Sequence, residues 1–550
     1  MTIQNGNPQD GADISDSTFS KRVRANQDRL RSELKPGYDF IVCGSGSSGS
    51  VVARRLAENA GVSVLLLEAG GGDEVPSVME AAQWALNLGS ERDWSFVGEP
   101  ESHLNGRTIP LAMGKVLGGG SSINVMTYSR GHKNDWDFFA SEAQDSTWNY
   151  DSVLNIYRRI EDWHGAPDPK YRGTGGPVFV QPAPDPSVIA PAMLEAANAV
   201  GIPIFENQNG RMMEGAGGAS FLDTRCRQGK RQSVFRSYVF PWMDRPNLTV
   251  LTHALVTHIT FEPARGNIRA AGVEMIYQGQ IHRVRADCEV VLSLGAIHTP
   301  KVLMQSGIGD QGELQGFGIP VVQHLPGVGQ NFQDHAAFGC LWEYREPLAP
   351  RNSGSEAVCF WKSDPNLDGP DLQIAHAEVP ISTVEAAARF KPPADCWTLW
   401  CGVVRPKSRG RVRLSGPDPL DPILIETNLL SDRDDMKAAI SCLDLAREIG
   451  NSAPLAPFAK REVMPGNLTG AALEGFLREA VISYWHQTCT AKMGRDSMSV
   501  VDNELRVYGV ENLRIADGAI MPRITTGNTM APCMVIGERA GEILKTRHGF

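Results

Sequence analysis

The sequence predicts an α/β fold with more than one domain, and three observations support this prediction. Residues 38–43 (YDFIVC) form a short apolar run rich in strand-forming residues, directly followed by glycines. A helical pattern at residues 48–59 then leads into a second apolar run at residues 62–67. Strand, helix and strand in this order make a βαβ unit. A chain of 550 residues also exceeds one ordinary hydrophobic core, so we expect two domains.

The segments on either side of the βαβ unit have weaker patterns. Residues 1–37 form an N-terminal extension, in which residues 1–17 are predicted to be disordered and residues 19–34 to form a short surface helix. Further strands are expected at residues 248–259, 271–276 and 288–293. Helices are expected before Gly307 and at residues 435–449 and 531–546.

Composition excludes several classes of function. A formal net charge of -10 argues against a nucleic-acid partner, which requires a clustered basic face. The ten cysteines include no CxxC pair and no grouping with histidine at zinc spacing, so we expect reduced thiols and no metal site. The N-terminus lacks the apolar segment of a secretory signal, and no apolar run is long enough to span a membrane. These features predict a cytoplasmic protein.

Two glycine triplets match the pattern GxGxxG, at residues 44–49 and 307–312. Only the first lies between a strand and a helix, where glycines let the backbone approach a pyrophosphate at the helix N-terminus. Glu68, at the end of the next strand, is placed to bind the adenosine ribose hydroxyls and would repel a 2′-phosphate. We interpret the second triplet as a helix-ending turn. The first indicates an ADP-containing cofactor without separating NAD from FAD.

Six further blocks of sequence follow the βαβ unit, in the order and at the separations that are typical of one known family. They occupy residues 114–131, 295–309, 325–335, 405–415, 484–494 and 513–544. From about Tyr38 onward the chain therefore resembles the glucose-methanol-choline (GMC) oxidoreductases, in particular bacterial alcohol oxidases and dehydrogenases with non-covalent FAD.

The resemblance implies a Rossmann-like FAD-binding domain interleaved with an α+β substrate domain, whose antiparallel sheet is covered by helices. The implied FAD-binding segments are 38–164, 231–335 and 481–550. The implied substrate-binding segments are 165–230 and 336–480.

FAD is the cofactor that the resemblance implies. The residues expected to bind it are Gly44, Gly46, Ser47, Ser48, Gly49, Glu68, Ala69, Val116, Gly119, Ser121, Asn124, Val125, Met126, Val256, Trp485, Asp517, Gly518, Asn528, Thr529 and Met530. A helix beginning near Met530 would direct its first amides at the flavin, where reduction leaves negative charge. Some relatives attach FAD through a histidine at the position of Ile123, so non-covalent binding is expected here.

The catalytic residues implied by the resemblance are His486 and Asn528. A neutral imidazole suits removal of a hydroxyl proton, so His486 is expected to act as the base and Asn528 to orient the alcohol. Trp485 is expected in the wall over the flavin. His335 belongs to another shared block, and we expect it to have a structural role.

The expected reaction is oxidation of a primary alcohol to the aldehyde, with hydride transfer to flavin N5 and reoxidation by O2 or another acceptor. Aryl or furanic, aliphatic or polyether, and sugar alcohols all remain open as substrates. Phe360, Trp361 and Trp485 are expected in the substrate pocket. We find no combination of a carboxylate with aromatic residues for a quaternary ammonium, so choline is not favoured. A lyase of the same fold and a non-redox flavoprotein are the alternatives.

Overall fold

The predicted βαβ unit lies at the centre of a mostly parallel sheet in the computed structural model, which describes residues 18–264 and 267–550. β1 (Gly37–Cys43) pairs in parallel with β2 (Val64–Leu67) and with β14 (Gln280–Leu292), and α2 (Ser47–Ala57) connects β1 to β2. The sheet also contains β11 (Leu248–Leu251), β12 (Ala254–Ala264), β13 (Asn267–Tyr277), β26 (Val510–Glu511) and β27 (Leu513–Ile515). All four residues of β2 are buried, as expected for a strand covered on both faces.

One predicted strand is two strands in the structure. The chain turns at His253, where φ is 56°, so that residues 248–259 divide between β11 and β12. β11 pairs with β2, whereas β12 pairs with β13. The sequence pattern missed this turn because both strands are apolar and no glycine or proline separates them.

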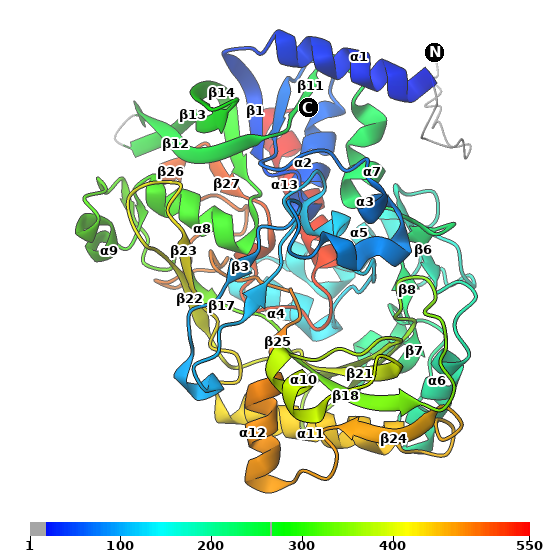
Figure 1. Cartoon of the computed structure of the whole chain (residues 1–550). Coiled ribbons are helices and arrows are strands. Elements are labelled where there is room, and N and C mark those ends of the chain that lie inside the picture. The colour runs from blue at the N-terminus through cyan, green and yellow to red at the C-terminus, as the bar shows by residue number, and fades with distance from the viewer. Residues whose placement is uncertain (1–17, 265–266) are drawn as a thin grey trace.

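A second sheet is antiparallel and occupies the opposite half of the molecule in Figure 1. Its strands are β7 (Gly218–Phe221), β18 (Ala336–Tyr344), β19 (Ala357–Trp361), β20 (Leu372–Ala377), β21 (Cys396–Val403), β24 (Ala459–Met464) and β25 (Ile482–Ser483). The helices α11 (Arg433–Gly450) and α12 (Gly470–Ala480) pack against it and cover its outer side. β25 lies directly before the block at residues 484–494, so the second sheet also positions that block.

The N-terminal helix α1 (Thr18–Ser32) closes one edge of the first sheet (Figure 1). Its Gln27 side chain is buried and donates hydrogen bonds to the carbonyls of Met243 (2.8 Å) and Leu248 (2.9 Å). The Gln27 amide oxygen accepts from the backbone N–H of Val250 at 2.9 Å. The helix therefore satisfies backbone groups of the edge strand β11, which would otherwise stay unpaired. The predicted disorder of residues 1–17 lies outside the described residues.

The second glycine triplet is a helix-ending turn, as predicted. α8 (Gly295–Gln305) stops two residues before Gly307, which has a φ of +83°, and the short helix α9 (Gln311–Gly316) follows. All ten cysteines are free thiols in the structure. Within residues 18–264 and 267–550, no helix combines the length and apolar character required to cross a membrane.

Candidate active site

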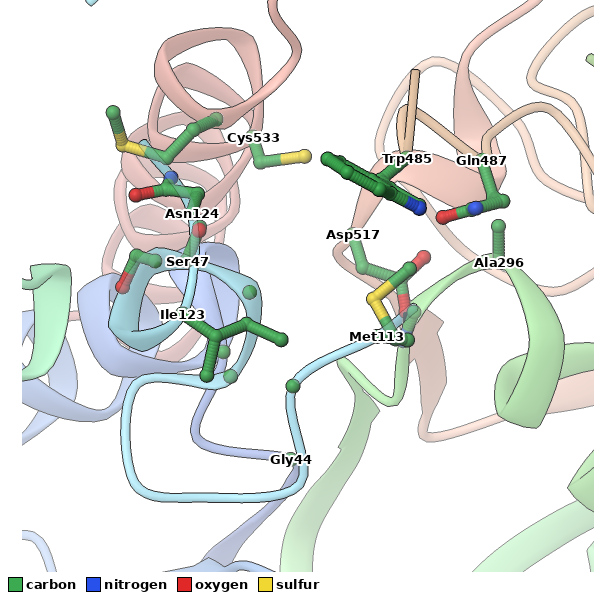
Figure 2. A pocket seen from close by; sticks show the side chains of 18 of the residues that line it. Gly44, Ser47, Met113, Ile123, Asn124, Ala296, Trp485, Gln487, Asp517 and Cys533 are labelled. Atoms are coloured by element: carbon green, nitrogen blue, oxygen red, sulfur yellow. Dashed lines mark hydrogen bonds between the residues drawn. The ribbon is translucent and has the colours of Figure 1, made fainter. Parts of the chain in front are cut away.

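A cavity lies beyond the carboxyl ends of β1 and β2 and reaches the second sheet at Trp400. Most of the residues singled out in the sequence line it, from several separate parts of the chain. These are Gly44, Gly46, Ser47, Ser48, Glu68, Ala69, Gly119, Ser121, Asn124, Val125, Val256, Trp485, His486, Asp517, Gly518, Asn528, Thr529 and Met530. Figure 2 shows Asn124 and Ile123 on one side of the cavity and Trp485 and Gln487 on the other.

Three of the expected cofactor residues, Gly49, Val116 and Met126, do not line the cavity. Gly49 sits in α2, where a Cβ atom would come within 1.9 Å of the Gly44 carbonyl oxygen. Val116 forms a bridge with Gly71, and Met126 is buried against other apolar side chains.

The structure does not bring Phe360 and Trp361 to the cavity, in contrast to the expectation. Both residues belong to β19, inside the second sheet. Phe360 is fully buried in a separate apolar cluster, and its ring lies behind Gly527, where a Cβ atom would come within 3.0 Å of it. Trp361 packs against the main core. Every residue of β19 except Trp361 is buried, so its apolar sequence does not reveal which face approaches the cavity.

The cavity end next to β1 has the form of a phosphate site. Gly46 is the N-cap of α2, with φ of -64° and no side-chain capping bond, so the first helical amides are not occupied by a side chain. A Cβ atom on Gly46 would meet no protein atom within 4 Å. A Cβ atom on Gly119 would lie 2.8 Å from the Gly46 Cα atom, so the two loops are in close contact. This part of the cavity fits the diphosphate of a dinucleotide.

A second helix N-terminus faces the same cavity. α13 (Met530–His548) begins where the sequence predicted, and its N-cap Thr529 makes no side-chain capping bond. The Ser48 hydroxyl donates to the Cys533 carbonyl at 2.7 Å, which places the N-termini of α2 and α13 side by side. Helix N-termini carry partial positive charge, so this arrangement favours an anionic ligand.

Two buried carboxylates that line the cavity accept hydrogen bonds from other groups of the protein. Glu68 accepts hydrogen bonds from the Ser45 hydroxyl (2.6 Å) and the Gly70 N–H (2.9 Å). Asp517 accepts from the Gly295 N–H (2.9 Å) and the Thr299 hydroxyl (2.6 Å). Burial raises the pKa of both carboxyl groups, and the hydrogen bonds oppose that shift.

His486 is the centre of a hydrogen-bonded group at the other end of the cavity. The side chain is 8% exposed, and its Nε2 atom lies 3.1 Å from the Asn528 Nδ2 atom. Its Nδ1 atom lies 2.9 Å from Nδ1 of His335. Burial lowers the pKa of His486 to about 3, so the imidazole is neutral at pH 7.

These contacts define which ring nitrogen of His486 carries the proton. The amide nitrogen of Asn528 donates, so Nε2 of His486 accepts and the ring proton sits on Nδ1. Nδ1 then donates to His335. His335, for which we expected a structural role, therefore contacts the proposed base directly. The sequence signal was its place in a shared block, but 151 positions separate the two histidines.

An aromatic wall stands beside His486. The rings of Trp400 and Tyr484 lie 4.4 Å apart between centroids, and those of Trp400 and Trp485 lie 5.7 Å apart. The Tyr484 ring also stacks on His486 at 5.4 Å. All four side chains line the cavity.

Comparison with known proteins identifies the family. Two sequence profiles, both described as GMC oxidoreductase, match residues 38–337 and 406–537. The chain belongs to the GMC oxidoreductase family. The mitochondrial choline dehydrogenase of Homo sapiens is 35% identical over 551 residues, covering 94% of this chain and 91% of that protein. The oxygen-dependent choline dehydrogenase of Stenotrophomonas maltophilia (strain R551-3) is 36% identical, covering 93% and 95%.

The fold of this GMC oxidoreductase agrees with solved structures. The crystal structure of pyridoxine 4-oxidase from Mesorbium loti superimposes with a TM-score of 0.87 at 30% identity, covering 94% of this chain and all of that one. The protein is therefore a FAD-dependent oxidoreductase that acts on CH–OH groups. Its mostly parallel sheet and its antiparallel sheet correspond to the Rossmann-like and substrate-binding parts of the family fold.

Several lining residues of the GMC oxidoreductase were not found by sequence reasoning. They are Trp84, Trp94, Thr127, His298, Trp400, Tyr484 and Gln487. His298 lies in the shared block at residues 295–309, which could have indicated it. Trp84 lies in the short 3₁₀ helix η1 (Ala81–Asn87) and Trp94 in the loop before β3 (Phe96–Val97), and neither segment has a recognisable sequence pattern.

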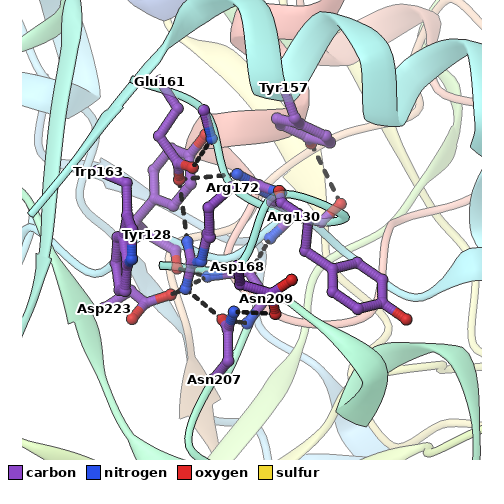
Figure 3. Close-up of polar contacts among 12 residues, drawn as sticks. Tyr128, Arg130, Tyr157, Glu161, Trp163, Asp168, Arg172, Asn207, Asn209 and Asp223 are labelled. Atoms are coloured by element: carbon purple, nitrogen blue, oxygen red, sulfur yellow. Dashed lines mark hydrogen bonds and ion pairs between the residues drawn. The ribbon is translucent and has the colours of Figure 1, made fainter. Parts of the chain in front are cut away.

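The loop that follows Thr127 is held by a buried ion network (Figure 3). Arg130 and Arg172 both contact the carboxylate of Glu161, at 2.7 and 2.9 Å, and Arg172 also pairs with Asp223. Two positive and two negative charges thus balance inside the protein. The network joins the lining segment at Thr127 to parts of the chain that are distant in sequence.

Proposed function

We propose that this GMC oxidoreductase oxidises a primary alcohol to the corresponding aldehyde, with non-covalently bound FAD and with His486 as the base. The observation that carries the proposal is the contact of a neutral, buried His486 with Asn528 at the wall of the cavity. Ile123 lines the cavity and has no nucleophilic atom, which supports non-covalent binding. Bound FAD supplies the hydride acceptor at its N5 atom.

At this end of the cavity, Asn528 and His486 would have different roles toward the alcohol. The substrate hydroxyl would replace the direct contact between Asn528 and His486, accepting from Nδ2 and donating to Nε2. His486 Nε2 then takes the hydroxyl proton as the C–H bond breaks. The resulting imidazolium keeps its second proton shared with His335, which limits the cost of a buried charge.

The lining residues favour an uncharged alcohol substrate whose carbon skeleton is aromatic or otherwise apolar. Trp400, Tyr484 and Trp485 provide apolar surface next to His486. The carboxylates in the lining, Glu68 and Asp517, are occupied by hydrogen bonds within the protein. At the end of the cavity next to His486, a quaternary ammonium would find no carboxylate among the described residues free to balance its positive charge. The curated relatives named above are choline dehydrogenases, so choline is the alternative substrate to test.

Anaerobic reduction of the purified protein tests the proposal. We expect a yellow protein whose visible absorption bleaches when benzyl alcohol is added without oxygen, and little bleaching with choline. Precipitation with acid should release the flavin, because it is not covalently attached. The rate at which absorption returns in air separates O2 from another acceptor. A yellow protein that no primary alcohol bleaches would instead favour a lyase or a non-redox flavoprotein.

The variant His486→Ala tests whether His486 is the catalytic base. It should keep its flavin and lose roughly a hundredfold or more in the rate of bleaching, the usual contribution of a general base. His282→Ala, in the strand β14 and outside the cavity, is the control and should bleach at the wild-type rate. Undiminished bleaching of His486→Ala would refute the assignment of the base.

A further inference from the structure

Two arginines, Arg225 and Arg231, are 1% exposed and have no carboxylate within 4 Å among the described residues. Other deeply buried arginines differ, because each has an acidic partner. These pairs are Arg130–Glu161, Arg172–Glu161, Arg236–Asp73 and Arg514–Glu289. A buried guanidinium without a counter-ion is costly, since desolvation is not offset by Coulombic attraction.

Both arginines bond only to neutral groups. Arg231 donates from Nε to the Val78 carbonyl (2.8 Å) and from Nη1 to Asn124 Oδ1 (2.8 Å) and the Ser121 carbonyl (3.2 Å). Arg225 donates to Met530 Sδ (3.0 Å) and to the Ser237 hydroxyl (3.1 Å). One nitrogen of each guanidinium, Nη2 of Arg231 and Nε of Arg225, has no partner among the described residues.

The electrostatic surroundings leave both charges uncompensated. Burial lowers the pKa of Arg225 to about 10, and burial together with repulsion from Arg225 lowers the pKa of Arg231 to about 9. Both side chains therefore stay protonated at pH 7. The tyrosines near Arg225, Tyr128 and Tyr238, are neutral at this pH because burial raises the pKa of their hydroxyls.

The residues that these arginines contact are part of the cavity wall. Ser121, Asn124 and Met530 all line the cavity, and Met530 is the first residue of α13, two positions after Asn528. By holding Asn124 Oδ1, Arg231 leaves the Asn124 Nδ2 group as a donor at the wall. Two positive charges and a helix N-terminus thus stand behind the part of the cavity wall that Ser121, Asn124 and Met530 form.

We propose that Arg225 and Arg231 are positioning residues that favour the reduced, negatively charged form of the bound flavin and so raise its reduction potential. The inference rests on the proposed function, because it requires FAD in this cavity. Uptake of two electrons and one proton, which the alcohol supplies, leaves one negative charge on the flavin. Two guanidinium groups in a region of low dielectric stabilise that charge. The same charges oppose entry of a cationic alcohol.

Reduction potentials of the holoenzyme test this role. We expect Arg225→Gln and Arg231→Gln each to lower the equilibrium constant for two-electron reduction at least tenfold, about 30 mV. Arg227→Gln is the matched control, because Arg227 is exposed on the neighbouring strand β9 (Cys226–Arg227) and solvent screens its charge. The equilibrium constant for two-electron reduction of Arg227→Gln should differ from the wild-type constant by less than twofold. Wild-type potentials in both buried variants would overturn the proposal.

Lysine variants separate charge from structure. Arg225→Lys and Arg231→Lys keep the positive charge but lose the planar set of donors. They should keep reduction constants within threefold of wild type, whereas an equal loss in the lysine and glutamine variants would show that packing alone matters.

Wild-type holoenzyme offers a second measurement that needs no variant. Between about pH 5.5 and pH 7 the reduction constant should change tenfold per pH unit, the dependence for uptake of one proton. A hundredfold change per unit indicates a neutral reduced flavin and contradicts the proposal. Anaerobic bleaching of the wild type reports on the proposed function independently. A colourless protein would overturn both.

Discussion

His335 and His486 face each other through their Nδ1 atoms at 2.9 Å, and one carboxylate fixes both of their backbones. Asp334 Oδ1 accepts hydrogen bonds from the N–H groups of His335 (2.8 Å) and His486 (2.9 Å). His335 is fully buried, and burial keeps its pKa well below the usual value, so its Nδ1 can accept a proton from the other ring. This pairing leaves the Nε2 atom of His486 as the acceptor at the cavity wall.

Replacing His335 should reduce the rate of alcohol oxidation without removing the flavin. His335→Leu takes away the acceptor for the His486 Nδ1 proton, and we expect kcat to fall about tenfold or more while KM changes little. His335→Gln provides an amide oxygen that can accept the same proton and should recover part of the loss. Steady-state kinetics with the best alcohol measure both. Equal rates for the two variants would show that the ring is needed only for packing.

The low pKa of His486 predicts a flat acid limb in the rate of flavin reduction. Only the neutral ring accepts the alcohol proton, and the neutral fraction falls as pH drops through the pKa, which burial places at about 3. The reduction rate should therefore be constant from about pH 8 down to about pH 5. Rapid mixing under anaerobic conditions measures it.

Asp334 is the control for this pH profile. Burial raises the pKa of Asp334 to about 7, so its titration could produce an inflection in the measured range. An inflection that disappears in Asp334→Asn belongs to that carboxyl group. One that persists near pH 6.5 would show that His486 titrates normally and would contradict the expected low pKa.

Local sequence patterns were sufficient to predict the helices and strands that surround the cofactor cavity. The βαβ unit and the helix at Met530 were predicted because short apolar runs, glycines and helical spacing are local signals. The cavity itself combines segments hundreds of residues apart, and only the resemblance to a family connected them. The aromatic wall was only partly found, because Trp400 lies in an entirely buried strand whose faces cannot be told apart by pattern.

Buried charges were the least predictable part of the site. Arginine is normally exposed, so nothing in the sequence around Arg225 or Arg231 indicates a desolvated guanidinium. The pairing of His335 with His486 likewise depends on two distant loops that Asp334 brings together. Such features follow from tertiary packing and cannot be inferred from local sequence.

Two neighbouring glycines should respond to alanine in different ways. At Gly46 a Cβ atom meets no protein atom within 4 Å and φ is -64°, so Gly46→Ala should fold. The methyl group would occupy the place where we expect the diphosphate, and we expect at least tenfold weaker flavin binding. At Gly49 the Cβ atom would lie 1.9 Å from a backbone oxygen, so Gly49→Ala should lower the melting temperature of the apoprotein.

Flavin absorbance per protein and apoprotein melting temperature together measure this contrast. Normal flavin content in Gly46→Ala would show that the diphosphate does not pass Gly46. An unchanged melting temperature in Gly49→Ala would contradict the close packing of α2 against β1.

Breaking the ion network of Figure 3 should be costly for stability. Arg172→Met leaves Glu161 and Asp223 with fewer partners in a buried site, and loss of one partner from such a group costs about 3–5 kcal/mol. Arg285→Met, which breaks an exposed pair with Asp287, is the control and should cost at most about 1 kcal/mol. Urea unfolding monitored by circular dichroism compares them, and equal costs would contradict the structural role of the network.

His376 should make the protein less stable in acid, and its removal should reverse that effect. The side chain is fully buried in β20, and neither ring nitrogen has a partner among the described residues. Burial lowers its pKa from 6.5 to about 3, so between these values the unfolded chain binds a proton that the folded chain does not. Stability from the neutral ring is therefore complete above pH 6.5 and is lost progressively as pH falls toward 3. His376→Leu should raise the melting temperature relative to wild type, more at pH 5 than at pH 8. An identical difference at both pH values would show that His376 is protonated equally in the folded and unfolded states.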